Sequence, residues 1–214
     1  MRTYISPIGF NSTSVTRPVL SNGLDTADQV VLVRPEADTD DSRAEEAIGD
    51  VRRLLAEVEP EVSLSTERVP HEGFETAVLR CRDLIRAAEG TVIVNLGGGA
   101  RDILLPFATA VLTELHHVDR TLLFSDIDGR VRDLELPRLT ASISDSERGT
   151  LAALNSTGGE SSIPELTERT QRSKSTIARH VDVLESNDAV VSRREGKTKH
   201  VSITLTGRLL VDRE

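Results

Sequence analysis

Hydrophobic and polar positions follow two different periods along the first two thirds of the chain. Short apolar runs of strand length recur, and between them lie longer stretches in which apolar residues return every three or four positions. The short runs predict five strands, at Thr3–Ile8, Gln29–Arg34, Val62–Arg68, Thr91–Asn95 and Thr121–Ser125.

Three amphipathic helices are predicted between these strands, each with a single apolar stripe. The stripes are Ala47, Ile48, Val51, Leu54, Leu55 and Val58; Ala77, Val78, Cys81, Leu84, Ile85 and Ala88; and Ile103, Leu104, Phe107, Val111, Leu112 and Leu115. Strands that alternate with helices are typical of an α/β fold, and we expect a Rossmann-like, mostly parallel sheet with helices on both faces. A hairpin turn at Asp128-Gly129, leading into Val131–Glu135, would end this sheet.

From residue 145 the pattern changes. Helix starts are indicated at Ser144, Ser162 and Ser173, where a capping residue precedes an acidic or polar first turn. Two strand-like runs follow, Val190–Arg194 and Lys199–Leu205. Three helices followed by a β-hairpin is the order of a winged helix-turn-helix. We therefore expect one domain over residues 1–136, an aperiodic linker over 137–144, and a second domain over 145–214.

The net charge of −9, taken over the whole chain, argues against a partner that is a polyanion. The charge is unevenly distributed, however. Residues 145–214 hold equal numbers of acidic and basic residues, so the whole acidic excess lies before them, and all three lysines of the chain lie within them.

The lysines and arginines of the second domain are concentrated where a winged helix would contact double-stranded DNA. The first half of its third helix would face base edges, and its hairpin would contact phosphates. The alternative is a small solvated helical domain that makes protein contacts. The expected DNA-binding residues are Arg172, Ser173, Lys174, Ser175, Thr176 and Arg179 on the helix, and Arg193, Arg194, Lys197 and Lys199 on the hairpin.

Composition narrows the other possibilities. Aromatic residues make up only 2% of the chain, which argues against a protein that binds single strands by stacking bases. Cys81 is the only cysteine, so neither an internal disulfide nor a cysteine-based metal cluster can form. The start of the chain does not resemble a signal peptide, and no apolar run is long enough for a membrane span, so we expect a cytoplasmic protein. Abundant acids with few lysines suggest a halophilic source.

Two loops of the first domain carry candidate chemistry. The run Asn95, Leu96, Gly97, Gly98, Gly99, Ala100 and Arg101 joins a strand to a helix, where backbone N–H groups, the helix N-terminus and an arginine could hold a phosphate. A tight turn without a ligand explains the glycines equally well. The second loop, which follows the first strand, contains Gly9, Phe10, Asn11 and Thr13. The two loops would adjoin if the first and fourth strands are neighbours.

These features resemble one known family. The first strand followed by Pro7-Ile8-Gly9-Phe10-Asn11, the glycine-rich turn ending in Arg101, and the C-terminal winged helix look like the CRISPR-associated Rossmann-fold (CARF) transcriptional regulators. The resemblance implies a homodimer that binds a cyclic oligoadenylate, with cyclic tetra-adenylate favoured, across its two-fold axis. It also implies winged helices that bind promoters at CRISPR loci. The ligand-binding residues carried over are Gly9, Phe10, Asn11, Thr13 and the seven residues from Asn95 to Arg101.

Some CARF domains cleave their ring ligand, so a ring-nuclease-like phosphodiesterase is the alternative, and a regulator that senses another nucleotide is a third possibility. Groups placed for acid–base catalysis are not evident near the loops. His71, His116 and His117 fit surface or helix-end positions, and Asp126 and Asp128 fit a turn. We therefore expect no catalysis, no metal and no cofactor besides the effector ligand.

Overall fold

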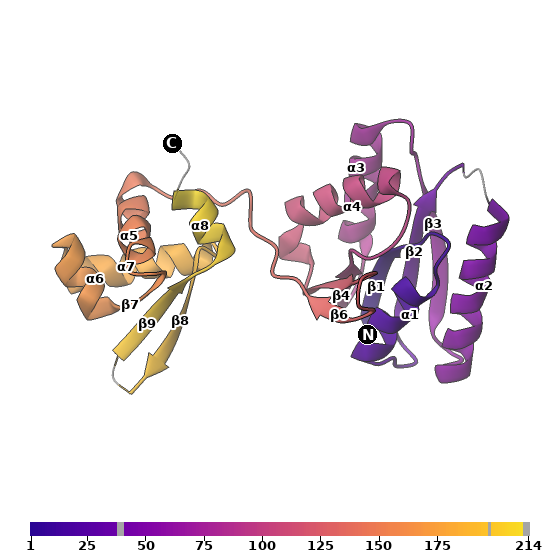
Figure 1. Cartoon of the computed structure of the whole chain (residues 1–214), viewed down its shortest axis with the longest axis horizontal. Coiled ribbons are helices and arrows are strands. Elements are labelled where there is room, and N and C mark those ends of the chain that lie inside the picture. Colours follow the sequence, from indigo (N-terminus) through magenta and orange to yellow (C-terminus); the bar gives the residue numbers. More distant parts are fainter. Residues whose placement is uncertain (38–40, 197, 212–214) are drawn as a thin grey trace. The chain divides into compact units, whose positions relative to one another are not determined.

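The computed structural model describes residues 1–37, 41–196 and 198–211 (Figure 1). The chain divides into two compact units, Met1–Leu134 and Glu135–Glu214. Each unit has its own buried apolar core. Lys197, one of the expected DNA-binding residues, lies outside the described residues.

The first unit contains a six-stranded sheet. Its strand order is β3-β2-β1-β4-β5-β6, in which the first five strands run parallel and β6 is antiparallel to β5. This arrangement confirms the predicted mostly parallel α/β sheet, including the terminal hairpin. The strands are β1 (Arg2–Pro7), β2 (Gln29–Pro35), β3 (Ser63–Val69), β4 (Thr91–Asn95), β5 (Arg120–Phe124) and β6 (Val131–Asp133).

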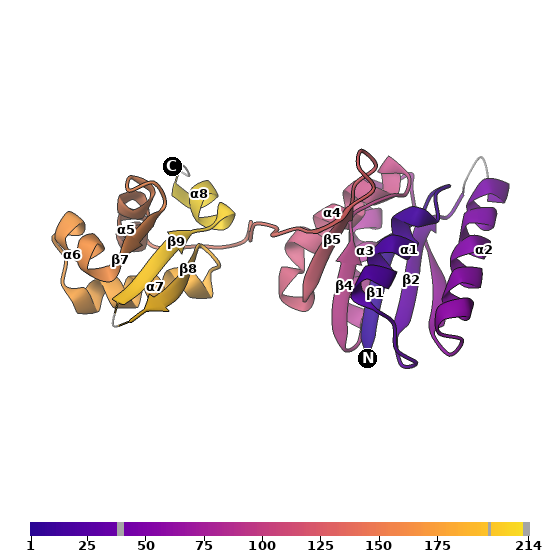
Figure 2. The ribbon, with the colours of Figure 1, turned by 60° about the horizontal axis from the view of Figure 1, so that its bottom comes forward.

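Helices cover both faces of this sheet, as Figure 2 shows. On one face, apolar residues of α1 and α2, such as Val15 and Val51, share a core cluster with Tyr4 and Ile93 of the sheet. On the other face α3 packs against α4. The helices are α1 (Thr13–Asn22), α2 (Asp41–Val58), α3 (Phe74–Ala87) and α4 (Arg101–Thr113), followed by the 3₁₀ turn η1 (Leu115–His117).

Cys81 lies on the buried stripe of α3 and is inaccessible to solvent. Burial disfavours the thiolate and raises the pKa of the Cys81 thiol to about 12. We expect a thiol reagent at pH 8 to leave the folded protein unlabelled and to react at once in denaturant. Rapid stoichiometric labelling of the native chain would contradict this placement. The single thiol then reports on opening of the first unit.

The second unit confirms the predicted order of three helices and a hairpin, and adds two elements. They are α5 (Asp145–Asn155), β7 (Glu160–Ser162), α6 (Ile163–Thr170), α7 (Lys174–Ser186), β8 (Val190–Glu195), β9 (Thr198–Ile203) and α8 (Leu205–Val211). The strands form an antiparallel sheet in the order β7-β9-β8. The predicted capping serines of α5 and α6 are confirmed, and each forms a capping box, Ser144 with Glu147 and Ser162 with Glu165.

The predicted last strand, Lys199–Leu205, is too long. The strand ends at Ile203, because the Thr204 hydroxyl accepts a hydrogen bond from the backbone N–H of Gly207 and so caps a new helix, α8. Gly207 packs closely here: a Cβ on it would lie 2.1 Å from the carbonyl oxygen of Ala189.

Residues 137–144, which the aperiodic sequence presents as a linker, belong in large part to the second unit. The backbone N–H of Arg138 donates to the Thr206 hydroxyl at 2.9 Å. Ala141 is buried in the core cluster of this unit. The chain is thus anchored to the second unit several residues before α5 begins.

None of the helices within the described ranges is both long and apolar enough to cross a membrane.

Candidate functional site

A pocket lies where the strand order of the first unit reverses. Strands β1 and β4 are neighbours and run parallel, so their carboxyl ends meet at one edge of the sheet. In open α/β sheets this switch point is where ligands bind. The pocket has a volume of about 240 Å³ and is lined by residues of both predicted loops, by Pro35 at the end of β2 and by Asp126 after β5. The lining residues are Ile8, Gly9, Phe10, Asn11, Ser14, Pro35, Gly98, Gly99, Ala100 and Asp126.

The buried side chain of Asn95 connects the turn after β4 to both ends of the loop between β1 and α1. Its side-chain amide nitrogen lies 2.7 Å from the Ser6 hydroxyl, 2.8 Å from the Ser14 carbonyl and 3.1 Å from the Gly97 carbonyl. Its side-chain oxygen accepts from the Gly97 N–H at 3.1 Å. Asn95 is buried and outside the pocket lining, so it positions the loops instead of facing a ligand.

Close packing between the loops requires the glycines. Gly98 has a φ of 96°, and a Cβ on it would lie 2.5 Å from the Ser14 hydroxyl oxygen. A Cβ on Gly97 would lie 2.9 Å from three atoms of Phe124 on β5. Packing alone therefore accounts for these two glycines, as the tight-turn alternative has it.

The two helices that begin at the pocket edge differ in their caps. Ala100, the N-cap of α4, has no side chain that could accept a hydrogen bond, so N–H groups of the first turn and the positive end of this helix dipole are available to an anion. At α1 the Ser12 side chain makes no cap, but the Asn11 side-chain oxygen accepts from the N–H of Thr13. Arg101, in the first turn of α4, is exposed and forms no ion pair with any described residue.

Phe10 provides an apolar surface at the pocket. Its ring is 48% exposed, and the guanidinium carbon of Arg43 on α2 lies 4.4 Å from the ring centroid. Beside it, the Asn11 side-chain oxygen accepts from the N–H of Thr13 at 3.0 Å, which shapes the turn into α1. A flat ring held by a cation is suited to stacking on a planar ligand group.

The structure brings together about half of the predicted ligand residues. Those that line the pocket are Gly9, Phe10, Asn11, Gly98, Gly99 and Ala100, while Thr13, Asn95, Leu96, Gly97 and Arg101 lie outside its lining. Sequence reasoning missed Pro35 and Asp126, and it placed Ile8 and Ser14 in the candidate loop without naming them as ligand residues. Asp126 was interpreted only as part of a turn. Its position directly after β5, the strand next to β4, places it at the same edge of the sheet.

The second unit exposes a polar and basic helix surface. Ser173 caps α7 by accepting from the N–H of Thr176 at 3.1 Å. Lys174, Ser175 and Arg179 project from the first turns of this helix and are exposed. Lys174 and Arg179 form no ion pair with any residue that the structure describes. Arg172, just before the helix, donates to the Ser146 hydroxyl of α5.

The two arginines of strand β8 in the hairpin differ in their surroundings. Arg193 pairs with Glu160 at 2.7 Å and with Glu195 at 3.1 Å. Arg194 is exposed and has no such partner within the described ranges.

Lys199 lies between β9 and α7. Its ammonium lies 2.9 Å from the Glu185 carboxylate and 3.4 Å from that of Asp182. Burial opposes ionisation of Glu185, but the hydrogen bonds from Lys199 and Ser192 and the charge of Lys199 together outweigh it and hold the pKa of Glu185 below its usual value. The ion pairs of Lys199 thus connect strand β9 of the hairpin to helix α7.

The structure thus defines a Rossmann-like domain with a pocket at the strand ends, followed in the chain by a helical unit with a β-hairpin. The family described as the Csa3 CRISPR-associated Rossmann-like domain matches residues 2–132. The chain belongs to this family, which confirms the resemblance for its first domain.

Solved structures extend this comparison. Enterococcus italicus Csm6 bound to cyclic hexa-2'-fluoro-hexa-dAMP shares the fold with a TM-score of 0.52 and 12% identity, over 88% of this chain and 53% of that one. The Bordetella bronchiseptica regulator BpsR, whose DNA binding is regulated by 6-hydroxynicotinic acid, matches 33% of this chain at 19% identity and a TM-score of 0.31. The Streptomyces coelicolor regulator PcaV matches 32% at 22% identity and a TM-score of 0.31.

The matches span 55% of BpsR and 50% of PcaV. Their TM-scores are too low to assign a fold to the second unit. No curated protein matches the chain.

Proposed function

We propose that the protein is a ligand-responsive, DNA-binding transcription regulator of CRISPR-associated loci, and that its pocket senses a cyclic oligoadenylate. The observation that carries the proposal is the pocket itself. It lies at the β1/β4 switch point of a Csa3-family domain and joins the uncapped N-terminus of α4 to an exposed aromatic ring. Helix N-termini suit phosphates, and the ring of Phe10 suits an adenine.

The ligand class follows from the size and chemistry of the pocket. A volume of about 240 Å³ holds part of an oligonucleotide ring. A two-fold ring such as cyclic tetra-adenylate would be completed by a second copy of the chain that offers the same loops, so the proposal includes a homodimer. In the Csm6 structure a cyclic hexanucleotide analogue is bound, and this supports a cyclic oligonucleotide as the ligand class.

The second unit would then bind double-stranded DNA. The polar start of α7 suits base edges in the major groove, and the exposed Arg194 on the hairpin suits a phosphate. Ligand binding would change the DNA affinity by shifting the relative pose of the two DNA-reading helices of the dimer.

We propose sensing without cleavage. Asp126 is the one titratable side chain among the described residues that line the pocket, and a metal-free phosphodiester cleavage also needs a group that neutralises charge in the transition state. The ring-nuclease alternative is tested by incubating the protein with cyclic tetra-adenylate and separating the products. Linear oligoadenylates that form in proportion to enzyme would establish the alternative.

Arg101→Ala tests whether the charge beside the pocket, in the first turn of α4, contributes to ligand binding. We expect the affinity for cyclic tetra-adenylate, measured by calorimetry, to fall about 10- to 100-fold, since a hydrogen bond from a charged group contributes about 1.5–3 kcal/mol. Arg53→Ala removes the same charge from the exposed surface of α2, away from the pocket, and should leave the affinity unchanged.

Gel shifts on CRISPR leader DNA, with and without the ring, then test the regulatory half. Equal affinities of the two variants for the ring would exclude Arg101 as a ligand contact. Failure of the protein to bind duplex DNA at any salt concentration would refute the regulator.

A further inference from the structure

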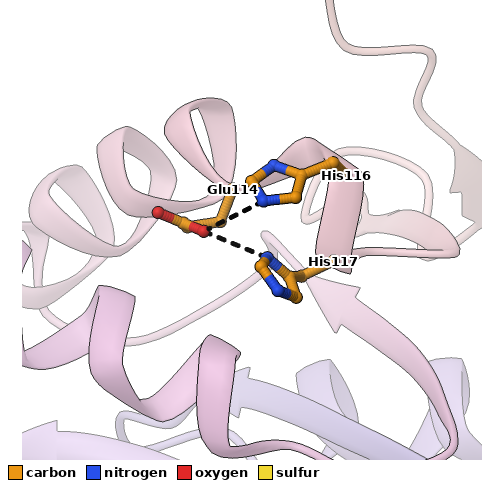
Figure 3. Close-up of side chains that lie close together, drawn as sticks. All are labelled: Glu114, His116 and His117. Carbon is orange, nitrogen blue, oxygen red and sulfur yellow. Dashed lines mark hydrogen bonds and ion pairs between the residues drawn. The ribbon is translucent and has the colours of Figure 1, made fainter.

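A second cluster of potential ligands lies at the opposite edge of the sheet from the pocket. There α4 ends at Thr113, and the chain passes through η1 into β5. Glu114, His116 and His117 come from this corner, and Figure 3 shows their side chains converging. Because the cluster precedes β5 whereas the pocket follows the strands, it has no part in the proposed function.

The two carboxylate oxygens of Glu114 have different partners. The side chain is only 3% exposed, and its Oε1 pairs with Arg86 of α3 at 2.8 Å. Its Oε2 faces both imidazoles, at 3.1 Å from Nδ1 of His117 and 3.7 Å from Nε2 of His116. The backbone fixes this arrangement, because the N–H of His117 donates to the Glu114 carbonyl at 2.8 Å.

The separations of the three ligand atoms fit a shared cation. The 3.7 Å between His116 and Glu114 is too long for a hydrogen bond. Ligand atoms about 2.0–2.1 Å from a tetrahedral ion are about 3.4 Å apart, and the two observed separations lie on either side of that value. The three ligand atoms all lie within 4.8 Å of one another.

We propose that Glu114, His116 and His117 bind one divalent transition metal of the Zn²⁺ class. Two imidazole nitrogens and one carboxylate oxygen suit Zn²⁺, Co²⁺ or Ni²⁺ and are unsuited to Mg²⁺ or Ca²⁺. Arg86 holds the carboxylate from behind, as outer-shell groups do in metal sites. Both imidazoles are partly exposed, so the fourth position is open to water.

The bound ion would link the α4–β5 corner to α3 through Glu114 and Arg86. Ligands that bind only the folded state stabilise it, so the role is a stabilising one for the first unit. The buried Cys81 cannot compete for the ion, because its thiol is inaccessible and un-ionised at neutral pH.

The test uses the full-length chain without a histidine tag. Zn²⁺ titration against a chromophoric chelator should give one site per chain, and Co²⁺ should give the visible absorption of a four-coordinate site. His116→Gln should weaken binding at least about tenfold, and His117→Gln similarly. His71→Gln, an exposed histidine in the loop after β3, is the matched control and should bind as the wild type does.

His116→Gln is the more informative variant. Its side chain is 58% exposed and contributes no hydrogen bond to the cluster, so the fold should survive, and shielding of Cys81 checks this. If Glu114, His116 and His117 only hold each other by hydrogen bonds and ion pairs at the end of α4, His116→Gln changes neither the Zn²⁺ affinity nor the Co²⁺ spectrum, and the proposal is wrong. Absence of Zn²⁺ binding to the wild type, or equal binding to all three variants, refutes it as well.

Discussion

Asn95→Ala should lower the free energy of unfolding of the first unit by about 3–5 kcal/mol and abolish ligand binding in the pocket. The wild-type amide satisfies Ser6, Ser14 and Gly97 at once, all in a buried place. Alanine leaves these polar groups without partners, and each stranded buried group costs about 1–3 kcal/mol. The effect is large because a single side chain supports both loops.

Denaturant unfolding followed by circular dichroism measures the loss of stability, and thiol labelling of Cys81 measures opening of the same unit. Asn11→Ala is the control, since Asn11 is exposed and its side chain supports one turn within a single loop. It should cost less than about 1 kcal/mol, the typical net value of one hydrogen bond. If Asn95→Ala is as stable as Asn11→Ala, the linkage of the loops does not depend on Asn95.

Lys174→Ala combined with Arg179→Ala should weaken duplex DNA binding by about 2–6 kcal/mol, at about 1–3 kcal/mol for each base-reading contact. A contact to phosphate instead would lower affinity evenly across sequences and reduce the dependence of log K on log salt by about one unit per residue. Both side chains are exposed on the first turns of α7 and lack ion pairs among the described residues, so their removal should leave the fold intact.

Two further variants separate DNA contact from structural effects. Arg208→Ala removes an exposed positive charge from α8 and should leave DNA binding nearly unchanged, apart from a small salt-dependent loss. Lys199→Ala should instead lower the stability of the second unit, because Lys199 clamps the hairpin to α7 through Glu185. Gel shifts at several salt concentrations distinguish these outcomes. Equal binding by the double variant and by Arg208→Ala would exclude α7 as the DNA-reading element.

The long elements could be predicted from the sequence because their periodicity is strong. All five predicted strands form within two residues of their expected bounds. Four of them are apolar runs that are largely buried, whereas β3 is an edge strand of mostly polar residues in which only Val69 is buried. Strand β7 and helix α8 could not be found in this way. The three residues of β7 are polar and form a strand only because β9 pairs with them, and α8 depends on the cap at Thr204.

The loops of the pocket could be located from the sequence, but the roles of their residues could not. Asn95 follows an apolar run and precedes glycines, which suggests a ligand contact; its burial beneath both loops depends on β1 and β4 being neighbours. Lys199 and Arg193 are similar cases. Their carboxylate partners Glu185 and Glu160 lie on other elements. The sequence alone therefore shows two positively charged residues, and only the structure shows that each is part of an ion pair.

The bonds of Asn95 also constrain how this protein could transmit a signal. The loops after β1 and β4 share one buried amide and contact each other so closely that Gly98 has no room for a methyl group. The two ends of the loop after β1 are therefore held to the turn after β4, because Asn95 bonds to Ser6 in β1 and to Ser14 in α1. If the pocket senses a ligand as proposed, we expect the response to be a rotation of the whole domain, the slower class of motion that takes microseconds to milliseconds.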